Sequence, residues 1–360
     1  MAKKTWVNIA GTWRNVKAVW LNVNGTWTKV VPKGNLDGVW KELITYYEQF
    51  VAAGIGWNVN YTTLVKKFDL QGKELSIKDF GTVGHLTDME VDPDGNLYVA
   101  IIDSLDIFDK SMELIRSHSR NFVTDVAVGK NRDYALIGQT GTTWYLEFWN
   151  REGVRTGRVV LPAASGGSVF RRGLCFDNNN DVIVHGDEGD LRKYDLLGNL
   201  IWRKTYVGSF SSDWGRIDVD TSNNIYRVCR GYIEKYNPNG DLITAKQVST
   251  STPPASGRGS IYVDKQEIFV TVWYSQTDQK PILAKFDKSL NRLSYVEDKL
   301  YETSVYADQS TGVYTYVKGY LNKHNKSDLS VIWSKRIQSS LEGGTCVCAP
   351  GRYGVFYREL

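Results

Sequence analysis

The stretch MEVDPDGNLYVA (residues 89–100) decides the fold, because two runs rich in alternating apolar residues flank the turn sequence DPDG. This pattern is typical of a β-hairpin. Six further copies follow, at residues 126–137, 174–184, 217–228, 261–272, 305–317 and 347–357. A second hairpin motif, first seen as LVKKFDLQGKEL (residues 64–75), alternates with the first. It is anchored by a recurring acid or amide: Asp69, Asp109, Asn150, Asp195, Asn237, Asp287 and Asn325.

Four short strands in every ~40–45 residues is the period of β-propeller blades. Seven copies of each motif therefore predict an all-β protein with a seven-bladed β-propeller over residues 61–360. The chain enters on the second motif and leaves on the first. We expect residues 64–75 and 347–357 to pair within one blade, since closing the ring removes exposed sheet edges.

The pattern "apolar-x-V-D-x-x-G-N-apolar-Y-V … F-D-x-x-G-x-L" resembles the NHL-like and quinoprotein-like propellers. Individual copies depart from it: Gly129 replaces the expected Asp, and the last copy has Ala349-Pro350. The resemblance implies the fold. It says little about function, because propellers host many unrelated functions.

Three short repeats precede the propeller: WVNIAGTWRNV (6–16), WLNVNGTWTKV (20–30) and GNLDGVWKEL (34–43). Each predicts a hairpin around a two-residue turn, for which Asn-Gly and Asp-Gly are favoured. Because one hairpin is marginally stable alone, we interpret residues 1–43 as an N-terminal hairpin repeat module for attachment. An extra subdomain packed on the propeller is the alternative, and residues 44–60 are expected to be a linker or an irregular extra strand. The attachment residues would be Trp6, Trp13, Trp20, Trp27 and Trp40.

The repeated unit W-x-N-V-x-G-T-W-x-x-V resembles the N-terminal segments of bacteriophage tail and baseplate proteins. The resemblance implies a virion protein of the phage tail, made in the host cytoplasm and oligomeric in its assembly. It would bind other virion proteins through residues 1–43. Its propeller would bind a host-surface glycan or a neighbouring subunit.

The composition narrows the partners. Hydrophobic residues make up 42% and charged residues 23% of the chain, enough for a sizeable core. The net charge of +4 is spread along the chain, so a nucleic-acid partner is not expected. No apolar run approaches a membrane span, and no secretory signal opens the chain. The four His and four Cys show no metal-ligand spacing, so we expect buried cysteines, no metal and no cofactor.

Connections between the motifs are longer than the turns inside them and emerge on one face, which is the expected binding surface. Exposed aromatic rings beside charged groups suit sugars, whose C–H groups stack while their hydroxyls hydrogen-bond. Packing of these aromatics between blades is the alternative. Arg172, Arg216 and Arg258 are expected just before inner strands, where side chains approach the central channel. Asp88 and Asp125 occupy comparable positions in earlier blades. The candidate ligand-binding residues are Trp144, Arg172, Phe210, Trp214, Arg216, Trp273 and Tyr274.

Catalysis has little support, because the chain lacks a G-x-S-x-G, a P-loop and an H-E-x-x-H motif. No catalytic residue is assigned. A propeller glycosidase or polysaccharide lyase stays open as an alternative, since a channel can bring carboxylates together. The residues available to it are Asp88, Asp125, Asp187, Glu188 and Asp213. A cellular protein-interaction scaffold is the third hypothesis.

Overall fold

The computed structural model describes the strands and turns of the chain, and it divides the chain into two compact units. One unit is Met1–Glu48 with Tyr353–Leu360, and the other is Gln49–Arg352. The described residues contain no helix, and so no helix able to cross a membrane. They are 5–9, 12–16, 19–23, 26–30, 33–36, 39–42, 50–55, 64–81, 86–161, 173–185, 190–205, 216–229, 231–248, 257–274, 282–297, 304–307, 312–317, 320–336 and 345–348.

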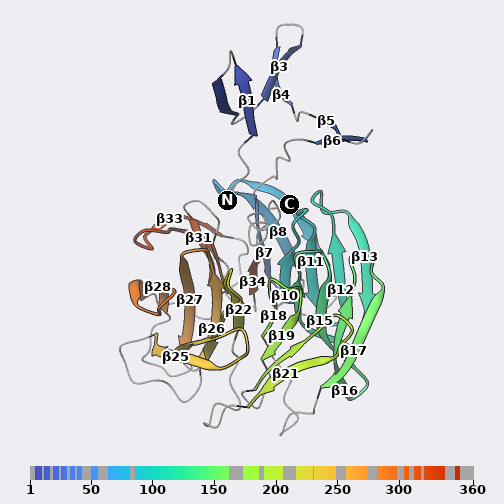
Figure 1. Cartoon of the computed structure of the whole chain (residues 1–360), viewed down its shortest axis with the longest axis vertical. Helices are drawn as coiled ribbons and strands as arrows, with labels where there is room; N and C mark the ends of the chain where they lie inside the picture. The colour runs from blue at the N-terminus through green and yellow to red at the C-terminus, as the bar shows by residue number, and fades with distance from the viewer. Residues whose placement is uncertain are drawn as a thin grey trace. The chain divides into compact units, whose positions relative to one another are not determined.

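Three separate hairpins form from the N-terminal repeats, drawn in dark blue in Figure 1. All three align the same repeat positions across the strands: Asn8 with Trp13, Asn22 with Trp27, and Asn35 with Trp40. Each register leaves two residues for the connection, the length that the Gly-containing pairs predict. Among the described residues no pairing joins one hairpin to another, so a single continuous module is not seen. The strands are β1 (Thr5–Ile9), β2 (Thr12–Val16), β3 (Val19–Val23), β4 (Thr26–Val30), β5 (Lys33–Leu36) and β6 (Val39–Glu42).

Six four-stranded antiparallel blades are each built from consecutive strands. The first three comprise β10 (Leu86–Val91), β11 (Leu97–Ile101), β12 (Ser104–Phe108), β13 (Leu114–Ser119); β14 (Phe122–Val128), β15 (Tyr134–Thr140), β16 (Thr143–Trp149), β17 (Arg155–Leu161); β18 (Leu174–Phe176), β19 (Val182–His185), β20 (Leu191–Tyr194), β21 (Leu200–Lys204). The next three comprise β22 (Arg216–Val219), β23 (Ile225–Cys229), β24 (Tyr232–Tyr236), β25 (Leu242–Gln247); β26 (Gly257–Val263), β27 (Glu267–Tyr274), β28 (Ile282–Asp287), β29 (Arg292–Glu297); β30 (Ser304–Ala307), β31 (Gly312–Val317), β32 (Tyr320–Asn325), β33 (Val331–Arg336).

A further four-stranded sheet, here called the composite sheet, has the order β34-β7-β8-β9 and joins both ends of the propeller sequence. Its strands are β34 (Thr345–Cys348), β7 (Phe50–Ile55), β8 (Leu64–Asp69) and β9 (Glu74–Asp79). As expected, residues from 64–75 and from 347–357 share one sheet, but they do not pair with each other directly. Instead β7, from the segment expected to be a linker or an irregular extra strand, lies between β8 and β34. The apolar run FVAAGI supplies that middle strand. The sequence predicted seven equivalent blades of paired motifs, but only six sheets of the described residues are built from four consecutive strands.

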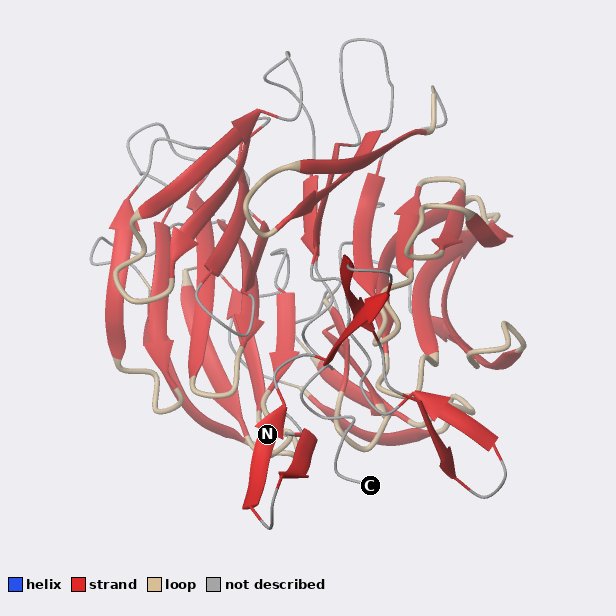
Figure 2. Ribbon diagram, turned by 90° about the horizontal axis from the view of Figure 1, so that it is seen from above, coloured by secondary structure: helices blue, strands red, loops and turns tan. Residues whose placement is uncertain are grey.

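The first strands of neighbouring sheets contact one another in a ring, seen from above in Figure 2. β34 contacts both β10 and β30, so the composite sheet lies between the first and last of the six consecutive blades. Second strands such as β11 are buried along their whole length, while outer strands such as β13 alternate between exposed and half-buried residues. The core is therefore formed where the sheets pack face to face.

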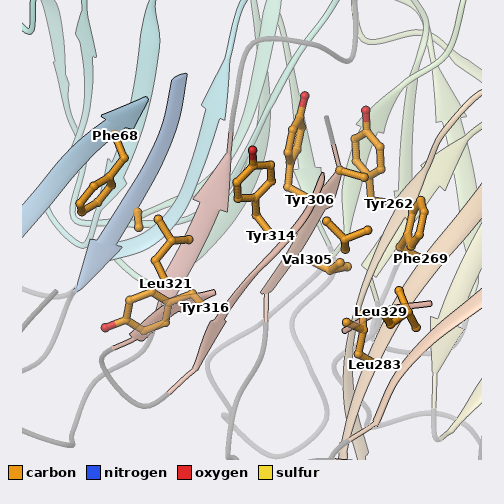
Figure 3. Close-up of a cluster of buried hydrophobic side chains, with 13 residues drawn as sticks. Phe68, Tyr262, Phe269, Leu283, Val305, Tyr306, Tyr314, Tyr316, Leu321 and Leu329 are labelled. Atoms are coloured by element: carbon orange, nitrogen blue, oxygen red, sulfur yellow. The ribbon is translucent and has the colours of Figure 1, made fainter. Parts of the chain in front are cut away.

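Side chains from three sheets meet in the cluster of Figure 3. Phe68 comes from the composite sheet, Tyr306 and Tyr314 from the β30–β33 blade, and Tyr262 and Phe269 from the β26–β29 blade. The rings of Tyr262 and Tyr306 lie 4.6 Å apart between centroids. Burial of large aromatic residues at the interface is a major part of what holds neighbouring sheets together.

The recurring acid or amide of each motif has the structural role expected of it. Oδ1 of Asp69, for example, accepts hydrogen bonds from the backbone N–H groups of Gln71 and Lys73, at 2.9 and 2.8 Å. The same pattern recurs at Asp92, Asp109, Asp177, Asp195, Asp220, Asn237 and Asp287. These side chains fix tight turns by replacing backbone acceptors.

Every outer strand of the seven four-stranded sheets carries a β-bulge near its start. A bulge increases local twist, which makes an edge strand a poor template for pairing with another chain. In six strands the skipped residue is an exposed aliphatic: Leu75, Ile115, Ile201, Ile243, Leu293 and Ile332. In β17 it is Thr156, whose hydroxyl donates to the Leu196 carbonyl at 2.6 Å.

Candidate functional site

Two neighbouring inner strands carry the same Thr-Asp dipeptide at a β-bulge. In β10 the pairing register skips Thr87 before Asp88, and in β14 it skips Thr124 before Asp125. The Thr124 hydroxyl lies 3.5 Å from the carbonyl oxygen of Ile137 in its partner strand. The Thr87 hydroxyl lies 3.1 Å from the carbonyl oxygen of Ala100 in its partner strand and 2.8 Å from that of Val123 in the neighbouring blade. Because a bulge re-aims the side chain that follows it, both carboxylates leave their strands in an equivalent way.

Arg216, the first residue of β22, reaches both carboxylates from a more distant blade. Its Nη2 and Nη1 lie 3.1 Å from Oδ1 and Oδ2 of Asp88, and Nη1 lies 2.7 Å from Oδ1 of Asp125. The two-oxygen contact with Asp88 has the fork geometry that gives guanidinium–carboxylate pairs their strength and orientation. Since the three residues come from three inner strands, the cluster lies inside the ring of those strands.

Burial differs sharply within this cluster. The side chains of Asp88 and Asp125 are 9% and 1% exposed, whereas that of Arg216 is 35% exposed. Asp88 also accepts the backbone N–H of Val126 through Oδ2, at 3.1 Å. The two buried carboxyl groups therefore hold the partly exposed guanidinium group of Arg216 in a fixed position.

The pKa values of the two carboxyl groups shift in opposite directions. Burial raises the pKa of Asp125 well above 3.8, and the charge of Asp88 raises it further against the opposing charge of Arg216. Burial acts in the same direction on Asp88, but Arg216 and hydrogen bonds from Asp125, Arg216 and Val126 outweigh it and lower that pKa. Oδ2 of Asp125 is buried and has no hydrogen-bond partner among the described residues.

The chemistry available is that of a pre-oriented guanidinium group held by two buried carboxyl groups. The exposed part of Arg216 can donate to an acceptor such as a hydroxyl or carbonyl oxygen. In the described part of the chain no group of three His, Cys, Asp or Glu side chains is arranged to hold a metal ion.

The predicted ligand residues have different outcomes. Arg216 joins Asp88 and Asp125, the two residues placed at comparable positions by the sequence. Trp144 is only 7% exposed and packs edge-on against Phe122, so it is not the surface platform expected. It follows the alternative, in which aromatic residues pack in the core.

The other predicted residues cannot be placed in a site. Trp273 and Tyr274 end strand β27, but their side chains lie outside the description. The attachment residues lie in the N-terminal strands, and their side chains also lie outside it: Trp6, Trp13, Trp20, Trp27 and Trp40. Wholly outside the described residues are Arg172, Phe210, Trp214, Asp187, Glu188 and Asp213. Of the cysteines, Cys175 and Cys229 are buried, as expected.

Thr87 and Thr124 were missed by sequence reasoning. A signal exists, because L-T-D and V-T-D occupy the same place in two successive copies of the first motif. A repeated Thr-Asp within an apolar strand marks a departure from alternation, which a bulge explains.

Comparison with known proteins supports the fold and goes no further. No protein-family model matches the sequence, and no match was found among curated proteins. A streptogramin B lyase structure is similar with a TM-score of 0.52 and 12% identity, over 80% of this chain and 94% of that chain. The C-terminal WD40 domain of Sif2 is similar with a TM-score of 0.55 and 12% identity, over 82% and 85%. A protein of unknown function from Bacteroides caccae has a TM-score of 0.47 and 9% identity, over 84% and 99%.

Proposed function

We propose that the protein is a binding protein of a bacteriophage tail or baseplate, with a ligand site in the propeller at Asp88, Asp125 and Arg216. The observation that carries the ligand site is the convergence of these residues from three blades. They include two buried carboxyl groups that both contact one partly exposed guanidinium.

The ligand class that best fits the site is a glycan of the host surface. A fixed guanidinium held by two carboxyl groups suits the hydroxyl and ring oxygens of a sugar, which are uncharged acceptors. Binding of the purified protein to a panel of bacterial surface glycans tests this. Arg216→Met should abolish binding. Arg132→Met, which removes a 38%-exposed arginine paired with Asp94, should leave it unchanged.

The N-terminal hairpins are proposed to attach the protein to the particle. Support comes from the sequence resemblance to phage tail proteins and from the identical Asn–Trp register of all three hairpins. Repetition of one cross-strand pair suits several equivalent docking contacts. Deletion of residues 1–43 should leave a folded propeller that is no longer incorporated into particles. Normal incorporation of the shortened protein would contradict the virion role.

A glycosidase is the second candidate, and one observation bears on it. The pKa of Asp125 is raised and that of the neighbouring Asp88 is lowered, the arrangement that a paired acid and base needs. Glycosidases, however, separate their two carboxyl groups by about 5–9.5 Å so that sugar or water fits between them. Here both carboxyl groups contact the same nitrogen, Nη1 of Arg216, at 3.1 and 2.7 Å, which disfavours this role. Shortening of a glycan chain during incubation with the protein would restore it.

A further inference from the structure

A second charged cluster surrounds Glu147 in strand β16, away from the Asp88–Asp125–Arg216 site. Three arginines contact this one carboxylate, which is 2% exposed. Oε2 accepts from Nε and Nη2 of Arg120, at 3.0 and 2.8 Å. Oε1 is shared by Nη1 of Arg155 at 3.2 Å and Nε of Arg158 at 3.3 Å.

The cluster has more positive charge than it neutralises. In the part of the chain that is described, the ion pairs of Arg120, Arg155 and Arg158 are made with Glu147 alone. Three guanidinium groups and one carboxylate leave a local charge of +2. Two of the guanidinium groups share a single oxygen, so their mutual repulsion is offset by only one acceptor. A second anion on their outer side would relieve it.

The arginines on the outer strand are open to solvent and held in place. The side chains of Arg155 and Arg158 are 43% and 31% exposed, against 20% for Arg120. The guanidinium of Arg158 also lies over the Tyr145 ring, 3.3 Å from its centroid, and its Nη2 donates to Thr140 at 3.3 Å. Fixed planar guanidinium groups bind carboxylate, sulfate and phosphate groups with little loss of side-chain entropy.

The local sequence explains why both arginines meet Glu147. The β-bulge at Thr156 places Arg155 opposite Trp149 and Arg158 opposite Glu147. Trp149 and Glu147 are two residues apart in β16 and point to the same face. Without the bulge the two arginines, three residues apart, would point to opposite faces. In the other outer strands this bulge carries an exposed aliphatic residue. In β17 it brings two arginines to the same face.

We propose that the Glu147–Arg120–Arg155–Arg158 cluster is a binding site for an anionic group of an acidic glycan, separate from the Asp88–Asp125–Arg216 site. A carboxylate is already the group these arginines hold. Nucleic acid is disfavoured, because it needs an extended basic track. The neighbouring Val154 and Val160 on this outer edge are exposed and apolar instead, at 60% and 64%.

The test uses tetragalacturonate, an oligosaccharide with one carboxylate on each sugar, and neutral galactotetraose as the uncharged probe. Calorimetric titration of the full chain should show binding of the charged probe alone, weakening as salt rises. The variant carrying Arg155→Gln and Arg158→Gln should lose at least about tenfold in affinity. Its matched control carries Arg132→Gln and Arg151→Gln, which removes the same charge from the same blade and should change affinity by less than about twofold.

A third variant, Glu147→Gln, should change the affinity for tetragalacturonate in the opposite direction. Removing the internal carboxylate leaves the arginines without a competing anion, so affinity for tetragalacturonate should rise if the variant unfolds as cooperatively as the original. The proposal is overturned if the Arg155/Arg158 variant binds as well as its control. It is also overturned if a single-stranded DNA oligonucleotide binds more tightly than tetragalacturonate with the same loss in that variant. Failure of Arg216→Met to affect tetragalacturonate leaves this site intact, because the proposed function rests on different residues.

Discussion

The ammonium group of Lys323 donates a hydrogen bond to the backbone carbonyl oxygen of Leu70, 2.9 Å away, across 253 residues of sequence. Lys323 lies two residues before the anchor Asn325, and Leu70 directly follows the anchor Asp69. The same relationship links Lys67 to the Lys110 carbonyl, Lys235 to that of Lys288, and Lys285 to that of Lys326, at 2.7 to 2.8 Å. A lysine at one repeat position thus links each of these sheets to the anchor turn of the neighbouring sheet. Lys323 makes this link between the last consecutive blade and the composite sheet.

Replacing Lys323 with Met should lower the free energy of unfolding by about 1–3 kcal/mol, the range for a hydrogen bond to a charged group. The methionine keeps the apolar stem but removes the donor, and the side chain is nearly buried. Urea denaturation followed by tryptophan fluorescence measures the change. The control is Lys66→Met, which breaks only a partly exposed ion pair with Glu74 and should cost under about 1 kcal/mol. Equal costs for the two variants would contradict a special role for Lys323.

The Asp88–Asp125 pair should make stability depend on pH in two opposite ways. The pKa of Asp125 is raised in the folded state, so the folded protein retains a proton that the unfolded chain loses above about pH 3.8. Stability from this group therefore falls as pH rises from 3.8 toward the folded pKa. The pKa of Asp88 is lowered, so its contribution is present above about pH 3.8 and is lost as pH falls below it.

Asparagine variants separate the two carboxyl groups. Asp125→Asn imitates the protonated acid, so it should be as stable as the original near pH 4 and at least as stable at pH 8. Asp88→Asn removes the ionised partner of Arg216 and should cost about 1–3 kcal/mol at pH 7, since Arg216 is partly solvated. Thermal unfolding measured from pH 4 to pH 8 gives both results. A larger loss at pH 7 from Asp125→Asn than from Asp88→Asn would reverse the assignment of the proton.

The imidazole of His118 should stay neutral at pH values well below the usual pKa of histidine. Burial, followed by the charges of Arg120 and Arg116, lowers its pKa to about 4. The ring lies 4.1 Å from that of Trp149, and Nε2 lies 2.6 Å from the Tyr134 hydroxyl. Because the unfolded chain takes up the proton first, this group's contribution to stability is full above about pH 6.5 and is lost between 6.5 and 4.

The check is an NMR titration of the histidine ring protons, with His118→Gln to assign the resonance. One resonance should show no inflection between pH 5.5 and 7.5 and should shift only as the pH approaches 4. An inflection near pH 6.5 for His118 would show that the imidazole is solvated, and the stability loss below pH 6.5 would then need another source.

The repeats explain how much of the fold the sequence could predict. The anchor residues, such as Asp69 and Asn325, recur because each must hydrogen-bond its own turn, a local requirement visible in one chain. Strand pairing at the ring closure depends on residues that are far apart in the sequence. β7 lies next to β8 in sequence but β34 does not, and the run FVAAGI lacks the alternation that would identify it as a strand.

The sites show the same division. The motif alignment placed Asp88, Asp125 and Arg216 at comparable positions, because a repeat position defines a place around the ring. Their contact depends on the two bulges, which no periodicity reveals. Trp144 failed as a surface residue because composition cannot show which side of a strand faces the neighbouring sheet. The Glu147 cluster depends on the bulge at Thr156, which brings two arginines to one face.

Gly72 should tolerate alanine poorly, because two independent constraints act on it. Its φ is +82°, and an added Cβ would lie 3.0 Å from Cε of Lys335 and 3.1–3.2 Å from the Trp333 ring. Gly141 provides the matched control, with a φ of +60° and open space around the added atom. Gly141→Ala should cost about 1 kcal/mol from backbone strain alone, and Gly72→Ala about 2–3 kcal/mol. Urea denaturation that gave the same cost for both would show that the Trp333 contact imposes no constraint.

Truncation at the C-terminus should separate two parts of the chain that lie close in sequence. Residues up to Arg352 belong to the propeller unit, while Tyr353–Leu360 group with the N-terminal residues. A chain ending at residue 352 should keep its cooperative unfolding transition.

A chain ending at residue 344 loses β34, which exposes the edge of β7 and removes the strand that contacts both β10 and β30. We expect the shorter chain to unfold at least about 5 °C lower, since a loss of 1 kcal/mol shifts the midpoint of a large domain by about 2–4 °C. Differential scanning calorimetry of both proteins decides this, and equal midpoints would mean that the composite sheet is held together without β34.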